Sequence, residues 1–200
     1  MRPPIALTIA GSDSGGGAGI QADLKTFLAL RVHGCSAISC ITAQNTCGVS
    51  RVDGLPPEAL TAQIEAVLSD LPVAAIKTGM LLNAALIAAA ADALRPLSVP
   101  RLIDPVMVSR AGAVLLESES IEAYRQQLLP LAELITPNLH EARLLSGLPI
   151  EDAAGVERAA ALLLEQGPQA VLIKGGGLPQ LRGHDYLLVR GAEGVWLRSA

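Results

Sequence analysis

Short apolar runs alternate with segments of helical periodicity along the chain, and this alternation limits the fold more than any other feature. The apolar runs predict buried strands at residues 5–10, 35–42, 73–77, 101–104, 134–136 and 170–174. Apolar residues three or four apart predict helices at residues 20–32, 83–94, 118–128, 138–146 and 152–165, and one that starts at Pro57. Strands that alternate with helices indicate an α/β fold, with a mostly parallel central sheet and helices on both faces.

Three further strands are predicted beside this alternation. Residues 49–55 predict a short extra strand, and residues 186–189 and 195–197 predict a terminal hairpin. The chain has 200 residues, with no internal repeat and no low-complexity linker. We therefore expect one domain that spans residues 1–200.

Composition argues against several classes of partner. Aromatic residues make up 2%, the formal net charge is −4, and no run of lysine or arginine occurs, so nucleic acid is not an expected partner. The apolar segment 81–94 contains Asn83 and Asp92 and is shorter than the roughly 20 residues of a membrane span. Three cysteines without CxxC spacing indicate free thiols in a reducing cytosol. We expect a cytoplasmic protein without a membrane partner.

A glycine-rich loop, residues 11–19, follows the first predicted strand at the point where a helix begins. Such a loop lets backbone N–H groups approach a ligand, and the positive end of the helix faces the same place. A flexible turn explains the glycines equally well, and neither the GxGxxG nor the Walker A pattern is present. Asp23, one turn into the helix, either complements the helix dipole or accepts a hydrogen bond from a ligand.

Other polar residues follow the remaining strands. Gln44 and Asn45 form an amide pair that suits the edge of a heterocycle, although an Asn-led turn is the simpler interpretation. The chain has 12 arginines and three lysines, and two of these lysines, Lys77 and Lys174, end strands ahead of glycine. Lysine at such a place either binds phosphate or merely reaches solvent.

Asp104, Asn138 and Glu141 are the candidate metal and phosphate residues. Asn138 and Glu141 are three residues apart at a predicted helix start, the spacing of a capping box, which is the simpler interpretation. Together with Asp104 they can also hold Mg²⁺ through water, because Mg²⁺ favours a few carboxylates, phosphate oxygens and retained water.

Six segments in this order and spacing resemble the hydroxymethylpyrimidine/phosphomethylpyrimidine kinases of thiamin biosynthesis, a family with the ribokinase-like three-layer fold. The segments are AGSDSGGGAGIQADLKT, TAQNTCGV, IKTGML, DPVMVSRAG, TPNLHEARLL and VLIKGGG, and the resemblance runs from about Ile5 to Trp196. It implies ATP- and Mg²⁺-dependent phosphorylation of 4-amino-5-hydroxymethyl-2-methylpyrimidine and then of its monophosphate. A homodimer is also expected, because dimers are common in the resembled family.

The resemblance also implies roles for individual residues. The pyrimidine pocket would be lined by Gly11, Asp23, Gln44, Met80 and Val106, with Gln44 at the ring edge. Asp104, Asn138 and Glu141 would organise Mg²⁺ and phosphates, with Asp104 and Glu141 on the metal side, and Lys174 would lie near the nucleotide phosphates.

One departure from the family pattern concerns catalysis. The family places its catalytic group in a Gly-Thr-Gly-Cys or Gly-x-Gly-Asp element that forms an anion hole, and these 200 residues contain none. We therefore expect this element beyond Ala200 and assign no catalytic residue within the chain. A chain that lacks this C-terminal segment should have little or no kinase activity, bind the pyrimidine and tend to associate through exposed apolar surface. Two alternatives stay open, a pyridoxal/pyridoxine kinase and a non-catalytic pyrimidine-binding protein.

Overall fold

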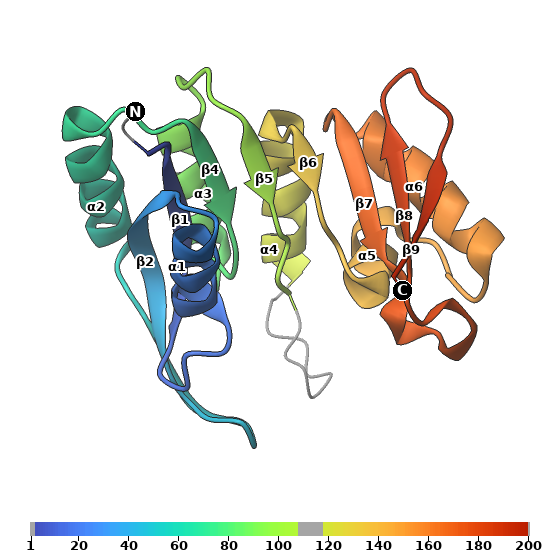
Figure 1. Ribbon diagram of the computed structural model, residues 1–200, viewed down its shortest axis with the longest axis horizontal. Helices are drawn as coiled ribbons and strands as arrows, with labels where there is room; N and C mark the ends of the chain where they lie inside the picture. The colour runs from blue at the N-terminus through green and yellow to red at the C-terminus, as the bar shows by residue number, and fades with distance from the viewer. Residues whose placement is uncertain (1–2, 108–117, 200) are drawn as a thin grey trace.

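The computed structural model describes residues 3–107 and 118–199. In these residues nine strands form one sheet in the order β3-β2-β1-β4-β5-β6-β7-β8-β9 (Figure 1). The five pairs from β2 to β7 are parallel, whereas β3, β8 and β9 run antiparallel to their neighbours. The strands are β1 Ile5–Asp13, β2 His33–Gln44, β3 Val49–Gly54, β4 Ala75–Thr78, β5 Arg101–Ile103, β6 Leu134–Ile135, β7 Ala170–Lys174, β8 His184–Val189 and β9 Val195–Arg198.

Two sequence-based expectations fall on residues outside the described ranges. Residues 108–112, which complete the segment DPVMVSRAG, lie outside them. Ala200, the residue beyond which the catalytic Gly-x-Gly element is expected, also lies outside them. The place of the catalytic element therefore stays a prediction.

Helices lie on both faces of the sheet. Figure 1 shows α1 in front of β1 and β2, and α3, α4 and α6 behind the sheet. The helices are α1 Gly19–Ala29, α2 Pro57–Asp70, α3 Ala84–Leu94, α4 Ser118–Ala123, α5 Leu139–Ser146 and α6 Ala153–Glu165. Within the described ranges, no helix combines the length and the apolar character that crossing a membrane requires. The expected order of strands and helices is confirmed.

Several element boundaries differ from the sequence-based expectation: α1 ends at Ala29 and not at residue 32, β2 extends two residues further at each end, and β4 covers residues 75–78 instead of 73–77. β1 continues to Asp13, three residues past the predicted end, because Ser12 and Asp13 still pair with β2. The predicted helix 118–128 divides into α4 and a π-helical turn, Tyr124–Leu128, which places the Tyr124 side chain in the core.

The two faces of the sheet differ in how well they are covered. On the face towards α3 and α6, the strands bury a continuous set of aliphatic side chains: Ile76, Ile103, Ile135, Val171 and Ile173. The opposite face carries Leu102 in register with Leu134, and Leu172 in register with Leu187 and Val195. Of the described helices, α1 lies on this face and packs on β1 and β2, so Val195 and Leu197 remain 52% and 43% exposed.

Candidate active site

The carboxyl ends of the parallel strands meet along one edge of the sheet, the lower edge in Figure 1. In open α/β sheets ligands bind beyond this edge. The candidate residues follow β1, β2, β4, β5, β6 and β7 in turn, so the fold brings the sequence-predicted positions to one side of the molecule. A parallel bridge between Asn138 and Lys174 extends the sheet there by one residue.

The glycine-rich loop is organised around the carboxylate of Asp13. Asp13 Oδ1 accepts from Gly15 N at 2.8 Å, and Oδ2 accepts from Gly17 N at 2.9 Å and from Ala18 N at 2.8 Å. The interpretation of this loop as a set of N–H groups directed at a ligand is therefore wrong for these three amides. The loop is an anion nest whose anion is part of the chain, and Asp13 takes the place that a phosphate would need at the start of α1.

The pKa of Asp13 reflects these contacts. Burial raises the pKa of the Asp13 carboxyl, whereas the hydrogen bonds from the N–H groups of Gly15, Ala18 and Gly17 lower it. Together these bonds outweigh burial, so the pKa lies below its ordinary value. A group whose pKa is lowered by folding stabilises the folded state above its unfolded pKa, and the stabilisation is lost as pH falls through the folded pKa. Asp13 therefore stabilises the loop at neutral pH and stops doing so in acid.

We expect Asp13→Asn to lower the free energy of unfolding by about 1–3 kcal/mol at pH 7, because the amide has one acceptor oxygen where the nest needs two. Urea unfolding at pH 7 and in acid measures the difference from the wild type, which should shrink as pH falls below the ordinary value of 3.8. The matched control is Asp53→Asn at an exposed ion pair, with an expected change of about 0.5 kcal/mol or less. An equal loss in both variants would contradict the nest.

Gly11 and Met80, two of the predicted pocket residues, lie together. A Cβ on Gly11 would come within 3.0 Å of Met80 Cε and 2.8 Å of Cys40 Sγ, so a larger residue there would displace both side chains. Ser39 Oγ donates to the Met80 carbonyl at 2.6 Å, which ties the segment after β4 to β2. Cys40, which sequence reasoning missed, therefore lies beside Gly11 and Met80.

The backbone of Gln44 is fixed by hydrogen bonds, while its side-chain amide retains groups that can bond a ligand. Ser14 Oγ donates to the Gln44 carbonyl at 2.7 Å and accepts from Gln44 N at 2.8 Å, so one hydroxyl fixes the end of β2. The Gln44 side-chain oxygen accepts from Thr42 Oγ1 at 3.2 Å. Asn45 accepts instead from the N–H groups of Cys47 and Gly48, so of the amide pair it is Asn45 that forms the Asn-led turn.

Asp23 lies over the sheet, where it meets Lys77. Its Oδ2 atom accepts from Lys77 Nζ at 3.1 Å and from Thr8 Oγ1 at 2.6 Å. The Asp23 side chain is 14% exposed and that of Lys77 is 25% exposed. The interpretation of Lys77 as a lysine that merely reaches solvent is therefore wrong.

A second lysine–aspartate pair lies further along the same edge. Lys174 Nζ is 3.1 Å from Asp104 Oδ1, which also accepts from Thr136 Oγ1 at 3.1 Å. Val106, the remaining predicted pocket residue, is half-buried, and its N–H donates to the Asp104 carbonyl at 2.8 Å. Because Lys174 lies at the carboxyl edge with a partly exposed side chain, it can meet an anionic ligand while remaining next to Asp104.

Glu141 completes a capping box with Asn138, as the simpler interpretation predicts. Asn138 Oδ1 accepts from Glu141 N at 2.9 Å, and Glu141 Oε2 accepts from Asn138 N at 2.8 Å. Unlike an ordinary surface cap, Glu141 is buried, and its Oε1 accepts from Met107 N at 3.4 Å. Burial raises the pKa of this carboxyl, although the Asn138 N–H and the charge of Lys174 oppose the rise.

The buried hydroxyl of Tyr124 belongs to the same region and was not anticipated. It donates to the Gly79 carbonyl at 3.3 Å. Burial raises the pKa of Tyr124, and the charges of Asp104 and Glu141 raise it further. The sequence gives no sign that Tyr124 meets the Gly79 carbonyl, because the π-helical turn that contains Tyr124 was not predicted.

The donor set near Lys174 fits a magnesium ion held mainly by water and phosphate. In the described part of the chain, no group of three or more His, Cys, Asp or Glu side chains is arranged as a metal cage. Asp104 Oδ1 is engaged by Thr136 and Lys174, and none of the described residues donates a hydrogen bond to Oδ2, which can therefore meet a cation or its water shell. Such a sparse set suits Mg²⁺, which retains waters and takes phosphate oxygens as ligands.

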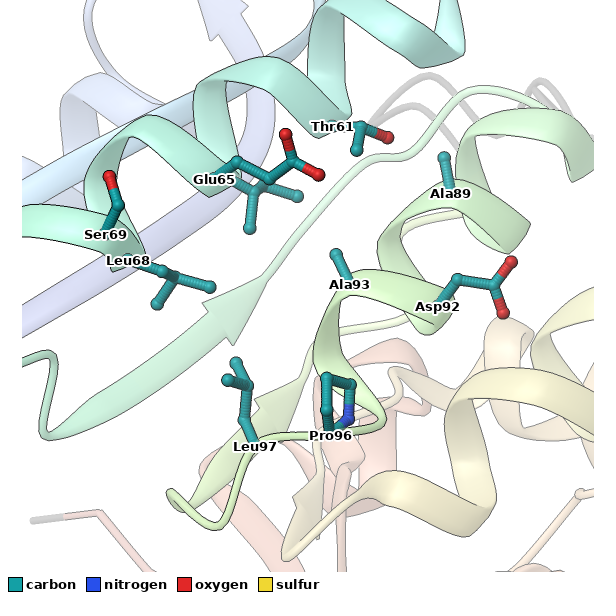
Figure 2. A pocket seen from close by; sticks show the side chains of 10 residues that line it. Thr61, Glu65, Leu68, Ser69, Ala89, Asp92, Ala93, Pro96 and Leu97 are labelled. Carbon is teal, nitrogen blue, oxygen red and sulfur yellow. The ribbon is translucent and has the colours of Figure 1, made fainter.

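A groove of about 800 Å³ lies between α2 and α3, away from this edge. Figure 2 shows Thr61 and Glu65 on α2 facing Ala89 and Asp92 on α3. Its lining continues to Pro96 and Leu97, ahead of β5, and includes no candidate residue. The groove is therefore not part of the candidate active site.

Comparisons with known proteins identify the family of the chain. The sequence pattern of the family described as Phosphomethylpyrimidine kinase matches residues 13–200. The hydroxymethylpyrimidine/phosphomethylpyrimidine kinase of Synechococcus elongatus is 61% identical over 176 residues, which cover 88% of this chain and 67% of that relative. The enzyme of the same name from Streptomyces coelicolor is 49% identical over 200 residues, 100% of this chain and 73% of that relative.

Solved structures show the same fold. The crystal structure of phosphomethylpyrimidine kinase from Clostridium difficile 630 is 42% identical, has a TM-score of 0.90 and matches over 98% of this chain and 84% of that chain. The ADP complex of Bacillus subtilis pyridoxal kinase is 38% identical, also with a TM-score of 0.90, over 98% of this chain and 75% of that chain. The fold and the site thus define a small-molecule kinase of the ribokinase-like class. Within that class, the chain belongs to the phosphomethylpyrimidine kinase family.

Proposed function

We propose that this chain binds 4-amino-5-hydroxymethyl-2-methylpyrimidine and its monophosphate for phosphorylation by ATP. The observation that carries the proposal is 61% identity to a relative named as the kinase of these two compounds. The site supports it, because polar groups for a ring edge and polar groups for phosphates lie along one edge of the sheet. Thiamin biosynthesis is the process in which this pair of phosphorylations belongs.

The pyrimidine end of the site comprises Gly11, Asp23, Gln44, Met80 and Val106. Gly11 lets the Met80 side chain pack directly against the backbone of β1, since a Cβ at this position would come within 3.0 Å of Met80 Cε. The Gln44 amide offers both a donor and an acceptor, which a pyrimidine edge with a ring nitrogen and an amino group requires. Ser14 fixes the backbone of Gln44, and Thr42 Oγ1 donates to the side-chain oxygen, so the amide has less conformational entropy to lose on binding.

The phosphate end comprises Asp104, Asn138, Glu141 and Lys174. Phosphoryl transfer depends mainly on positioning and on stabilisation of charge. Lys174 would place its positive charge beside the transferred phosphoryl group, and Asp104 and Glu141 would orient the water shell of Mg²⁺. When bound, Mg²⁺ supplies charge neutralisation to the nucleotide phosphates. The substrate oxygen forms the new bond to phosphorus, ADP departs, and the hydroxyl proton leaves with a base, which we expect in the element beyond Ala200.

We expect Gln44→Leu to weaken pyrimidine binding by roughly 1–3 kcal/mol, because a ring edge that enters the site then loses its hydrogen-bond partner. Titration calorimetry with 4-amino-5-hydroxymethyl-2-methylpyrimidine measures this directly and does not depend on turnover. The exposed amide Gln126, substituted in the same way, provides the control with unchanged affinity. Unchanged affinity in Gln44→Leu would remove this residue from the pocket.

Pyridoxal is the second candidate substrate, because a pyridoxal kinase shares the fold with a TM-score of 0.90. Competition between pyridoxal and the pyrimidine in the same titration separates the two. The expected homodimer stays a prediction. The cytoplasmic location also stays a prediction.

A further inference from the structure

The contacts around Asp23 divide its two carboxylate oxygens into different roles. Both hydrogen bonds that the described residues donate to this side chain end on Oδ2, one from Thr8 Oγ1 and one from Lys77 Nζ. The Thr8 side chain is fully buried in the middle of β1, and Lys77 is its partner in register on β4. Residues of two adjacent strands, β1 and β4, therefore bind Oδ2, and none of the described residues donates a hydrogen bond to Oδ1.

The position of Lys77 links this pair to the pyrimidine end of the site. A Cβ on Gly79 would lie 3.6 Å from Lys77 Nζ and 2.9 Å from Ala10 Cβ. Gly79 directly precedes Met80, and Ala10 directly precedes Gly11, the two residues that meet each other at the carboxyl edge. The ammonium group of Lys77 therefore lies beside Gly79, one residue before Met80, while it is bonded to Asp23.

A lysine at this position has a consequence that an arginine would not have. The ammonium group is a point charge, whereas a guanidinium fork tends to engage both oxygens of a carboxylate. Although the chain has 12 arginines and three lysines, the residue that meets Asp23 is a lysine. The pairing compensates the charge of a largely buried carboxylate and still leaves one oxygen as an acceptor.

We propose that Lys77 is a positioning residue that fixes Asp23 so that Oδ1 accepts a hydrogen bond from the exocyclic amino group of the substrate ring, through the N–H that Gln44 does not engage. This proposal rests on the proposed function. The pair thereby selects rings that present a donor at that position over rings that present an acceptor, since an oxo group would face a carboxylate oxygen with no proton between them. Lys77 acts through Asp23 and does not itself touch the reacting atoms.

The test compares two ligands, 4-amino-5-hydroxymethyl-2-methylpyrimidine and its 4-oxo analogue, by titration calorimetry on the whole chain. The wild type should bind the amino ring at least about tenfold more tightly than the oxo ring. In Lys77→Met the carboxylate loses its anchor, and the preference should fall to about threefold or less. Lys77→Arg should also lower the affinity for the amino ring, because the fork occupies both oxygens.

Two controls separate positioning from general damage to the fold. Arg95→Met removes one half of the exposed Arg95–Asp92 pair at the C-terminal end of α3 and should leave the preference unchanged. Thr8→Val keeps the shape of the side chain and removes only the second donor to Oδ2, so a smaller loss of preference is expected, and it serves if Lys77→Met does not fold. Thermal melting of each variant reports whether the fold is retained.

The outcomes have distinct meanings. Loss of preference in folded Lys77→Met or Thr8→Val supports the proposal. A wild-type preference that survives both substitutions overturns it while the proposed function stands. A purely structural role would lower the affinity for both rings equally, together with the melting temperature, and would also overturn it. If the wild type binds neither ring, the proposed function fails and this inference fails with it.

Discussion

Replacing Gly19 with alanine should lower the free energy of unfolding by about 3 kcal/mol or more and weaken pyrimidine binding in the same protein. Gly19 begins α1 with φ of +56°, a conformation that costs an L-residue free energy. An added Cβ would also run into the carbonyl oxygen of Gly11, which is backbone and has no side-chain freedom with which to move away. Because Gly11 forms part of the proposed pocket, the same shift should disturb the ring site.

The matched control is Gly48→Ala, in the turn between β2 and β3. A Cβ there meets nothing within 4 Å, so we expect a change of about 0.5 kcal/mol or less. Urea denaturation measures stability, and calorimetry with the pyrimidine measures binding. Equal stability of Gly19→Ala and Gly48→Ala would show that the loop adjusts freely and that Gly11 does not depend on it.

Glu141→Gln should abolish most of the Mg²⁺-dependent gain in nucleotide affinity, with an expected loss of about tenfold or more. The amide keeps the size of the side chain and one acceptor oxygen but removes the charge that would orient the water shell of Mg²⁺. Calorimetric titration of ADP at several Mg²⁺ concentrations measures the effect without requiring turnover. A modest loss of stability, about 1 kcal/mol, is expected in addition, because the side chain caps α5.

Capping and metal binding make different predictions for this variant. If Glu141 were only a cap, stability would fall and the Mg²⁺ dependence would stay as in the wild type. The control is Asp152→Asn, which alters the exposed carboxylate cap of α6. Asp152 accepts a single bond from Gly155 N, so its substitution should change stability without changing nucleotide binding.

Patterns among neighbouring residues predict most of the secondary structure. The bounds of β7 and the start of α2 agree with the sequence-based expectation, because alternation of buried side chains and a proline at a helix start are properties of neighbouring residues. The capping box at Asn138 and the Asn-led turn at Asn45 follow from contacts two to four residues apart for the same reason. Six short segments in a fixed order then identify the family, since their combination is specific although each one alone is not.

Tertiary structure alone decided which charges meet. Lys77 and Asp23 are 54 residues apart, and Lys174 and Asp104 are 70 apart, so their pairing depends on the order of strands in the sheet and not on local spacing. The direction of the N–H groups in the glycine-rich loop also could not be predicted from the sequence. Glycines permit many backbone conformations, so residue type does not specify which acceptor these N–H groups reach. Only the fold shows that Asp13 is that acceptor.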